Sequence, residues 1–321
     1  MSKKSMAARR QMREATAEGR TGGNRQQSRS RPRGRNYRRN ESGRPWGMIS
    51  AVLGIVAVFV IVVVVLELTL QGSLKQDTQV LPAPASLINS VTSTPLKTLE
   101  AVKAGSITHP PVNVPASYKA VALSSQGLPE IAYVGAEYCP YCALQRWSLV
   151  IGLSHFGKWS NLHLIHSSVY EPGLASLATF TFAHGTRFTS PYVVFLGREY
   201  QNNISLHHDG PPYGRFQSLS KTLTAAFTGI AGGSYPFVDY GGKMAQVESG
   251  AAATNVAHLQ GLTWDQIAQK LRNPKSVVAQ EVLGGANYVT AATCLLTGQK
   301  PGAVCTSSMI RTLEGQLEGS A

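Results

Sequence analysis

The sequence is poor in cysteine, and this scarcity excludes the small disulfide-rich scaffolds of secreted proteins. Only four cysteines occur in 321 residues. They form two pairs along the chain, Cys139 with Cys142 and Cys294 with Cys305, and both pairs follow the one long apolar segment. In an oxidising compartment this placement predicts two bridges, one local and reactive and the other structural.

Acidic residues are nearly missing from residues 1–48, which hold 14 of the 30 Lys and Arg but only three Glu. The rest of the chain carries 16 basic and 14 acidic residues, so most of the formal net charge of +13 belongs to this tail. A basic tail is typical either of a nucleic-acid or anionic-lipid patch or of a segment that fixes topology and solubility. Aromatic residues are scarce among its arginines, so we favour the second interpretation and expect no nucleic-acid partner.

Large apolar side chains are almost absent from residues 1–45, which predicts a disordered basic cytoplasmic tail. Gly47–Leu66 then runs without a charge for about 30 Å as a helix. We predict a single transmembrane helix at 46–68 rather than a cleaved signal peptide, whose apolar region is usually shorter. The basic residues before it predict a cell-membrane protein that contacts the lipid bilayer, with a cytoplasmic N-terminus and an extracytoplasmic C-terminal part.

The chain beyond the apolar segment divides into three parts. Residues 69–117 are rich in Pro, Ser and Thr, which predicts an extended linker. From about residue 118 the pattern becomes that of a packed α/β protein, with a core at 118–232 and a hairpin and helical extension at 233–321.

The first cysteine pair lies where a strand is predicted to lead into a helix. The strand covers Glu130–Ala136, and the buried helix after the cysteines ends at Gly157. Unpaired backbone N–H groups and the helix dipole at a helix start favour a thiolate, so Cys139 is the predicted nucleophile. Cys142 lies three residues along on the same side, where it can resolve a mixed disulfide.

Four further residues are candidates for substrate binding. Pro140 and Tyr141 lie between the two cysteines, and Pro140 suits the first helical turn. Ser190 and Pro191 directly precede the predicted strand Tyr192–Leu196. A proline at this point indicates either a turn or a cis-proline that lies against the cysteine loop and binds the substrate backbone.

Glu137 is a further catalytic candidate because it immediately precedes the cysteine motif. If its carboxylate is buried, it can accept the proton that Cys142 must lose. The alternative is an exposed loop carboxylate without a chemical role.

Several separated segments resemble the membrane-anchored family called domain of unknown function 929. The segments are VGAEYCPYCALQRWSLVIGLSHFG, SPYVVF, YPFVDYGGK, LTWDQIAQKLRNP and ANYVTAATCLLTGQKPGAVC. The resemblance covers roughly residues 118–310 and implies a thioredoxin-like fold, but no established activity. The predicted fold class is therefore α/β, a thioredoxin-like core with a C-terminal helical extension, preceded by a single transmembrane helix. CPYC alone also resembles glutaredoxins, but no glutathione pocket is evident.

The C-terminal part predicts a hairpin at Gly241-Gly242, a capping box at Thr263–Gln266 and a helix that ends near Gly284-Gly285. Cys294 and Cys305 follow. A bridge between them would close a ten-residue loop and contribute about 2–3 kcal/mol, so we predict a structural disulfide. The alternative is a second redox pair that exchanges electrons with the first.

Two alternatives concern the chemistry of the cysteines. CxxC could be half of a zinc site completed by Cys294 and Cys305 or by histidines, but the second spacing is wide. His207-His208-Asp209 is predicted to be a solvated loop, and His163 and His166 ordinary strand residues. We predict no metal and no cofactor.

Two function classes remain. The first is a thiol–disulfide oxidoreductase that acts on exported cysteine-containing proteins and is served by an unidentified redox partner. The second is a non-catalytic binding or scaffold module with structural disulfides. The sequence does not set the direction of electron flow, because the Pro-Tyr dipeptide alone does not fix the reduction potential.

Overall fold

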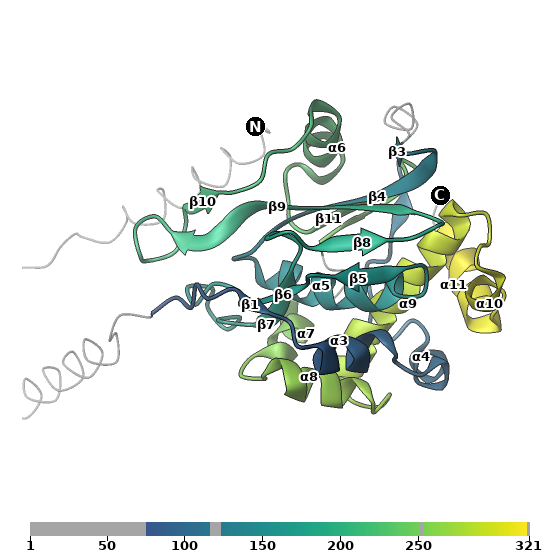
Figure 1. Ribbon diagram of the computed structural model, residues 1–321, viewed down its shortest axis with the longest axis horizontal. Helices are drawn as coiled ribbons and strands as arrows, with labels where there is room; N and C mark the ends of the chain where they lie inside the picture. The colour runs from purple at the N-terminus through teal and green to yellow at the C-terminus, as the bar shows by residue number, and fades with distance from the viewer. Residues whose placement is uncertain (1–74, 116–122, 249, 251–252, 320–321) are drawn as a thin grey trace, which may run out of the picture. The chain divides into compact units, whose positions relative to one another are not determined.

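A central β-sheet organises the described part of the chain. The computed structural model describes residues 75–115, 123–248, 250 and 253–319 (Figure 1). Their strands are β1 (Leu81–Pro82), β2 (Val112–Asn113), β3 (Ser124–Ser125), β4 (Leu128–Ala136), β5 (Lys158–Ser160), β6 (His163–His166), β7 (Ala178–Thr181), β8 (Arg187–Thr189), β9 (Val194–Ser205), β10 (Tyr213–Arg215), β11 (Phe237–Tyr240) and β12 (Met244–Val247).

Two of the helices precede the central strand, in the segment where an extended linker was predicted. They are α3 (Ala85–Thr92), α4 (Leu96–Val102), α5 (Pro140–Leu153), α6 (Lys221–Ala231), α7 (Ala253–Val256), the 3₁₀ turn η1 (Ala257–Leu259), α8 (Trp264–Leu271), α9 (Val277–Leu296), α10 (Gly302–Cys305) and α11 (Ser308–Glu318).

The largest sheet has the order β10-β9-β4-β11-β12-β2, with β3 added to the start of β4. Strands β4 and β9 are parallel, with Val134 opposite Arg198, whereas β11 runs antiparallel to β4, with Phe237 opposite Val134. Every residue of β4 from Ile131 onward is buried, as expected for a strand covered on both faces. This strand carries the chain directly to the cysteine motif.

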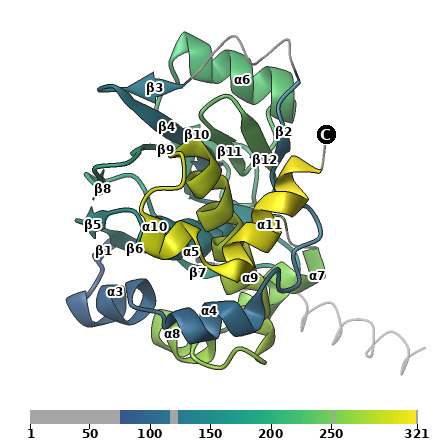
Figure 2. The same cartoon turned by 90° about the vertical axis from the view of Figure 1, so that its right-hand side faces the viewer.

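Helices cover both faces of the sheet (Figures 1 and 2). Helix α6 packs on one face, where Leu223 and Phe227 join a small core with Val134 and Phe237. Helices α5 and α9 cover the other face as part of a much larger core. That core includes Trp147, which is fully buried, as its position in the apolar pattern predicted.

Helices α5 and α9 pack closely and run in the same direction. Ser148 donates a hydrogen bond to the Val282 carbonyl at 2.9 Å, and one turn later Gly152 lies against Val289. A Cβ atom added at Gly152 would lie 2.7 Å from the Ala286 carbonyl oxygen. The close approach therefore depends on a glycine in the middle of a helix.

The predicted fold class is wrong. The described residues form a mixed α/β fold in which the strand expected after the first helix, now β6, joins a separate sheet of order β1-β6-β7. No helix within the described ranges is both long and apolar enough to cross a membrane. The transmembrane helix expected at 46–68, like the tail at 1–45, lies outside these ranges.

The segment expected to be an extended linker contributes instead to the core. Within 69–117, helices α3 and α4 bury Leu87, Val91, Leu99 and Val102. Strand β1 pairs with β6. The Pro and Ser residues that suggested a spacer lie at helix starts and turns; Pro84 and Pro95, for example, are the N-cap residues of α3 and α4.

Glycines account for two differences in element boundaries. The predicted break at Gly284-Gly285 is absent, because α9 continues through these residues where the Ala104 backbone and Ser148 approach it. Likewise, β9 runs through Gly197, which lies against Phe182, where a turn was expected. By contrast, the β11–β12 hairpin and the Thr263–Gln266 capping box are confirmed.

Candidate functional site

Cys139 and Cys142 lie at the start of α5. Cys139 is the N-cap residue, and its Sγ accepts a hydrogen bond from the Cys142 backbone N–H at 3.2 Å. Pro140 occupies the first turn, where its missing N–H leaves no bond unmade. Neither cysteine is in a disulfide; Cys142 is fully buried, and Cys139 keeps 5% of its surface exposed. An incoming sulfur would therefore meet Cys139 first.

The two thiols lose their protons as a pair. Burial raises the pKa of Cys139 well above its ordinary value, and the hydrogen bond with Cys142 adds to this rise. Burial also acts to raise the pKa of Cys142, but the hydrogen bond from Cys139 and the charge of Arg146 outweigh it, and the net shift is downward. The first proton is therefore lost from the pair as a unit, and the hydrogen bond between the sulfurs and the charge of Arg146 favour that loss. The sequence had placed the lowered pKa on Cys139.

A fully buried ion pair lies beneath the cysteines. Arg146 Nη2 and Nε donate to the Glu199 carboxylate at 2.7 and 2.9 Å, and Nη2 also donates to the Ala136 carbonyl. Both side chains are 0% exposed. Arg146 follows Cys142 by four residues, so both project from the same face of α5.

The charge of Arg146 reaches the cysteines. It acts to lower the pKa of both thiols, although burial keeps the net shift of Cys139 upward, whereas Glu199 acts to raise the pKa of Cys142. Arg146 Nη1 has no hydrogen-bond partner within the described residues, nor has the nearby Tyr133 hydroxyl. Sequence reasoning missed this ion pair, although an arginine within an otherwise apolar helical stretch was a usable signal.

Glu137 is buried, which was the condition for a role as proton acceptor. Its carboxylate accepts a hydrogen bond from Thr181 Oγ1 at 2.7 Å and lies 3.3 Å from His184 Nε2. Burial, together with the charge of Glu199, raises the pKa of Glu137 to about 7. Burial lowers the pKa of His184, so near pH 7 this contact is a hydrogen bond rather than an ion pair. The Glu137 carboxylate thus faces β7 and the turn after it, and the carboxylate that acts on Cys142 is Glu199.

Cys139 borders a cavity of about 460 Å³. Pro140 and Tyr141, both predicted to contact substrate, line it. The remaining lining residues are Tyr138, Glu171, Gly233, Ser234, Tyr235 and Glu248. The aromatic wall is ordered by stacking: the Tyr138 ring lies parallel to that of Tyr213, with centroids 3.9 Å apart.

The structure does not bring Ser190 and Pro191 to this cavity. Ser190 Oγ donates to the Phe156 carbonyl, just beyond the C-terminal end of α5. Helix α5 is about 21 Å long, and the cysteines lie at its other end. Nor is Pro191 a cis-proline; the cis-proline next to the cavity is Pro236, which follows Tyr235. The prediction failed because two prolines precede strands of this sheet, and the pattern did not distinguish them.

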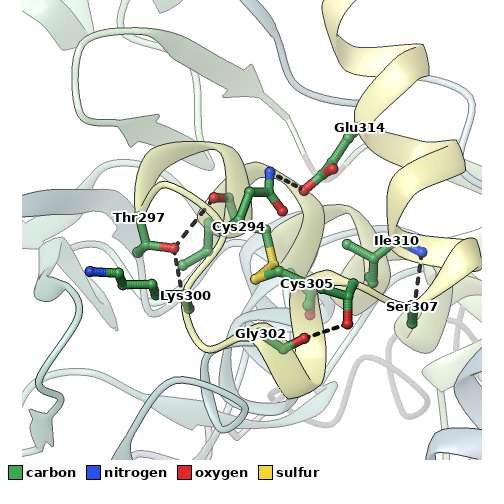
Figure 3. The surroundings of a disulfide bond; sticks show 12 residues. Cys294, Thr297, Lys300, Gly302, Cys305, Ser307, Ile310 and Glu314 are labelled. Atoms are coloured by element: carbon green, nitrogen blue, oxygen red, sulfur yellow. Dashed lines mark hydrogen bonds between the residues drawn. A yellow bond between two sulfur atoms is a disulfide. The ribbon is translucent and has the colours of Figure 1, made fainter.

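The second cysteine pair forms a disulfide (Figure 3). It joins Cys294, near the end of α9, to Cys305, the last residue of α10, and both are fully buried. Because α5 and α9 run in the same direction, Cys294 lies level with the C-terminal end of α5, about 20 Å along the helix axis from Cys142. This separation argues against direct exchange between the pairs.

The disulfide also bears on the zinc alternative. Bonded to each other, Cys294 and Cys305 are not available to complete a site with Cys139 and Cys142. His166 instead contacts Asp77 at 2.8 Å, and His207-His208-Asp209 lies in the exposed loop between β9 and β10. In the described part of the chain no group of three or more His, Cys, Asp or Glu could hold a metal ion.

Residues 115–210 match the family model of a domain of unknown function (DUF929). The match covers less than a third of the chain and supports the resemblance to this family there. The family's description names no activity. It includes the cysteine motif, Arg146 and Glu199, but ends before Tyr235 and Glu248. No curated protein and no solved structure matches the chain.

Proposed function

We propose that the chain is a thiol–disulfide oxidoreductase that uses the chemistry of thioredoxin-like proteins. One observation carries the proposal: a free pair of cysteines lies at a helix start, with Cys139 on the wall of a cavity and Cys142 buried behind it. An accessible nucleophile with a shielded resolving thiol is the arrangement that this chemistry requires.

In the reductive direction, the proton in the hydrogen bond between the two sulfurs moves to Cys142, and the Cys139 thiolate attacks one sulfur of a substrate disulfide. A bond forms between the two sulfurs, the substrate bond breaks, and the released sulfur leaves as a thiolate that takes up a proton. Cys142 then loses its proton and attacks Cys139 Sγ, which releases the second substrate thiol. Two electrons have passed to the substrate, and the pair is left as a disulfide. The reverse sequence oxidises a substrate dithiol.

The ion pair of Arg146 and Glu199 supports the second step. Cys142 is fully buried, and a thiolate there is costly without a nearby positive charge. The Arg146 guanidinium supplies that charge, and Glu199 fixes its position through two hydrogen bonds. We assign both as positioning residues. Glu137 is coupled to this ion pair, because the charge of Glu199 contributes to its raised pKa.

We propose that the substrates are exported cysteine-containing proteins and that a separate redox partner restores the pair. The disulfide between Cys294 and Cys305 supports a location outside the cytoplasm, because such bonds persist in oxidising compartments.

The test is reduction of insulin, and oxidation of reduced ribonuclease, by the purified full-length chain. We expect activity in at least one assay, its loss in Cys139→Ser, and a trapped mixed disulfide with substrate in Cys142→Ser. Equal activity in the wild type and Cys139→Ser would favour the non-catalytic scaffold.

A further inference from the structure

The cavity beside Cys139 combines aromatic rings with carboxylates. Three tyrosines, Tyr138, Tyr141 and Tyr235, share its lining with Glu171 and Glu248. No Lys, Arg or His is among the described residues that line it. The charged groups that line the cavity are therefore both negative, and its largest side chains are aromatic.

The tyrosines form a preordered wall. Tyr138 stacks on Tyr213, with their planes 7° apart, and meets the edge of Tyr235 at a centroid distance of 6.3 Å. The Tyr213 hydroxyl donates to Ser168 Oγ at 2.7 Å, which holds the stack in place. Ring faces held in this way attract a cation without further ordering of the site.

The carboxylates of Glu171 and Glu248 both line the cavity beside Cys139. Burial raises the pKa of Tyr141, and the charges of Glu248 and Glu171 add to this rise, so their fields reach the cysteine motif. Glu248 is exposed, and Glu171 is half-buried, with its Oε1 3.4 Å from the Tyr213 hydroxyl oxygen. One nearby cation opposes them: the Arg215 guanidinium lies 4.5 Å from the Tyr200 ring centroid and acts on Tyr235 from outside the cavity lining.

We propose that this cavity selects substrate cysteines that have a lysine or arginine next to them in the polypeptide. When the substrate sulfur meets Cys139 Sγ, a neighbouring basic side chain reaches the tyrosine faces and the carboxylates of Glu171 and Glu248. An acidic neighbour meets like charge there. This inference rests on the proposed function, because it names the substrates of the same site.

The experiment uses three disulfide-linked peptides that are identical except for Lys, Gln or Glu beside the cysteine. The full-length chain, previously reduced, is mixed with each, and the second-order rate of peptide reduction is measured. Each rate is divided by the rate at which dithiothreitol reduces the same peptide, because a lysine also makes its neighbouring disulfide intrinsically more reactive. At low ionic strength we expect the Lys peptide to react roughly tenfold faster than the Glu peptide, a difference of about 1.4 kcal/mol. Salt at 0.5 M should reduce this ratio.

A double variant tests the assignment to the two carboxylates. In Glu171→Gln with Glu248→Gln the ratio should fall to about twofold or less, whereas the rate for the Gln peptide should change little. The matched control is Glu100→Gln with Glu318→Gln, which removes two exposed charges from α4 and α11 and should preserve the tenfold ratio.

The outcomes separate the two proposals. Equal normalised rates for the three peptides overturn the substrate preference while leaving the oxidoreductase intact. A preference for lysine that persists in the Glu171 and Glu248 double variant overturns this cavity as its source. If no peptide is reduced, the oxidised chain is mixed with the corresponding reduced peptides, which gives the same comparison in the reverse direction. Failure in both directions overturns the oxidoreductase itself, and the substrate preference with it.

Discussion

The two cysteine pairs consist of the same side chains but differ in their surroundings. Cys139 and Cys142 lie at the start of α5, free, beside a cavity and above a buried ion pair. Cys294 and Cys305 lie near the ends of α9 and α10, bonded and enclosed by apolar side chains. Burial alone does not distinguish them, since both pairs are buried. The differences are the helix end at which each pair lies and the charge nearby. These determine whether a sulfur can change between its thiol and thiolate forms.

The largest expected effect is the loss of disulfide reduction when the first pair is disrupted. Cys139→Ser removes the attacking sulfur, so we expect disulfide reduction to fall on the order of 10³-fold while the free energy of unfolding changes little. The control is Ser154→Ala, at the other end of α5. Insulin turbidity measures the rate, and urea unfolding confirms that the fold is retained. Retained activity would mean that the site lies elsewhere.

The next largest effect is expected from changes to the Arg146–Glu199 ion pair, which lies near the first cysteine pair and not the second. Arg146→Met leaves Glu199 buried without its partner, which should cost about 4 kcal/mol of unfolding free energy. The double variant with Glu199→Met removes both charges and should recover more than half of that loss. If the double variant is no more stable than the single one, the ion pair is not the source of the effect.

The same double variant separates a redox role from a structural one. Arg146 lowers the pKa of Cys142 by more than Glu199 raises it, so loss of both side chains should raise the pKa for the first proton. The measurement is the pH profile of iodoacetamide alkylation, which should shift to higher pH than in the wild type. An unchanged profile in a stable double variant would assign Arg146 to packing alone.

The second pair is expected to matter for stability alone. The double variant Cys294→Ser with Cys305→Ser opens a short loop, and chain entropy predicts a loss of about 3 kcal/mol. Urea unfolding measures this loss, and disulfide reduction at 20 °C should stay within twofold of the wild type. A large loss of activity in folded protein would make this pair a second redox centre, despite the distance between the pairs.

Local chemistry was the part of the molecule that the sequence predicted well. The helix start at Cys139, the hairpin at Gly241-Gly242 and the capping box at Thr263–Gln266 depend on residues close together in the chain, and all three are present. The disulfide between Cys294 and Cys305 is likewise local.

Long-range placement was not predicted, because single-chain patterns do not state which elements meet. The sequence did not reveal that β6 leaves the main sheet, that α3 and α4 pack into the core, or that Tyr235 rather than Pro191 borders the cavity. The partner of Arg146 was hidden for the same reason, since Glu199 is 53 residues away. Two glycines in α9 suggested a helix end but allow close packing instead.

The smallest expected effect concerns Glu137 and its dependence on pH. The pKa of this carboxyl is about 7 in the folded chain, above the 4.5 of a free glutamate. The folded state therefore holds a proton that the unfolded state releases, so stability from this group is fully present below pH 4.5 and is lost as the pH rises to about 7. Glu137→Gln cannot ionise. Relative to the wild type, its stability should rise by about 3 kcal/mol across that window.

The side-chain amide of this variant still offers an oxygen to the Thr181 hydroxyl, so that hydrogen bond is kept and the net gain at pH 8 should be about 3 kcal/mol. Urea unfolding at pH 4.5 and pH 8 measures both values, with Glu318→Gln as the control for loss of one exposed charge. A difference between variant and wild type that is the same at both pH values would mean that folding leaves the pKa of Glu137 at its ordinary value. In that case Glu137 is ionised at pH 7 despite its burial, and Glu137 and Glu199 are both negatively charged near Arg146.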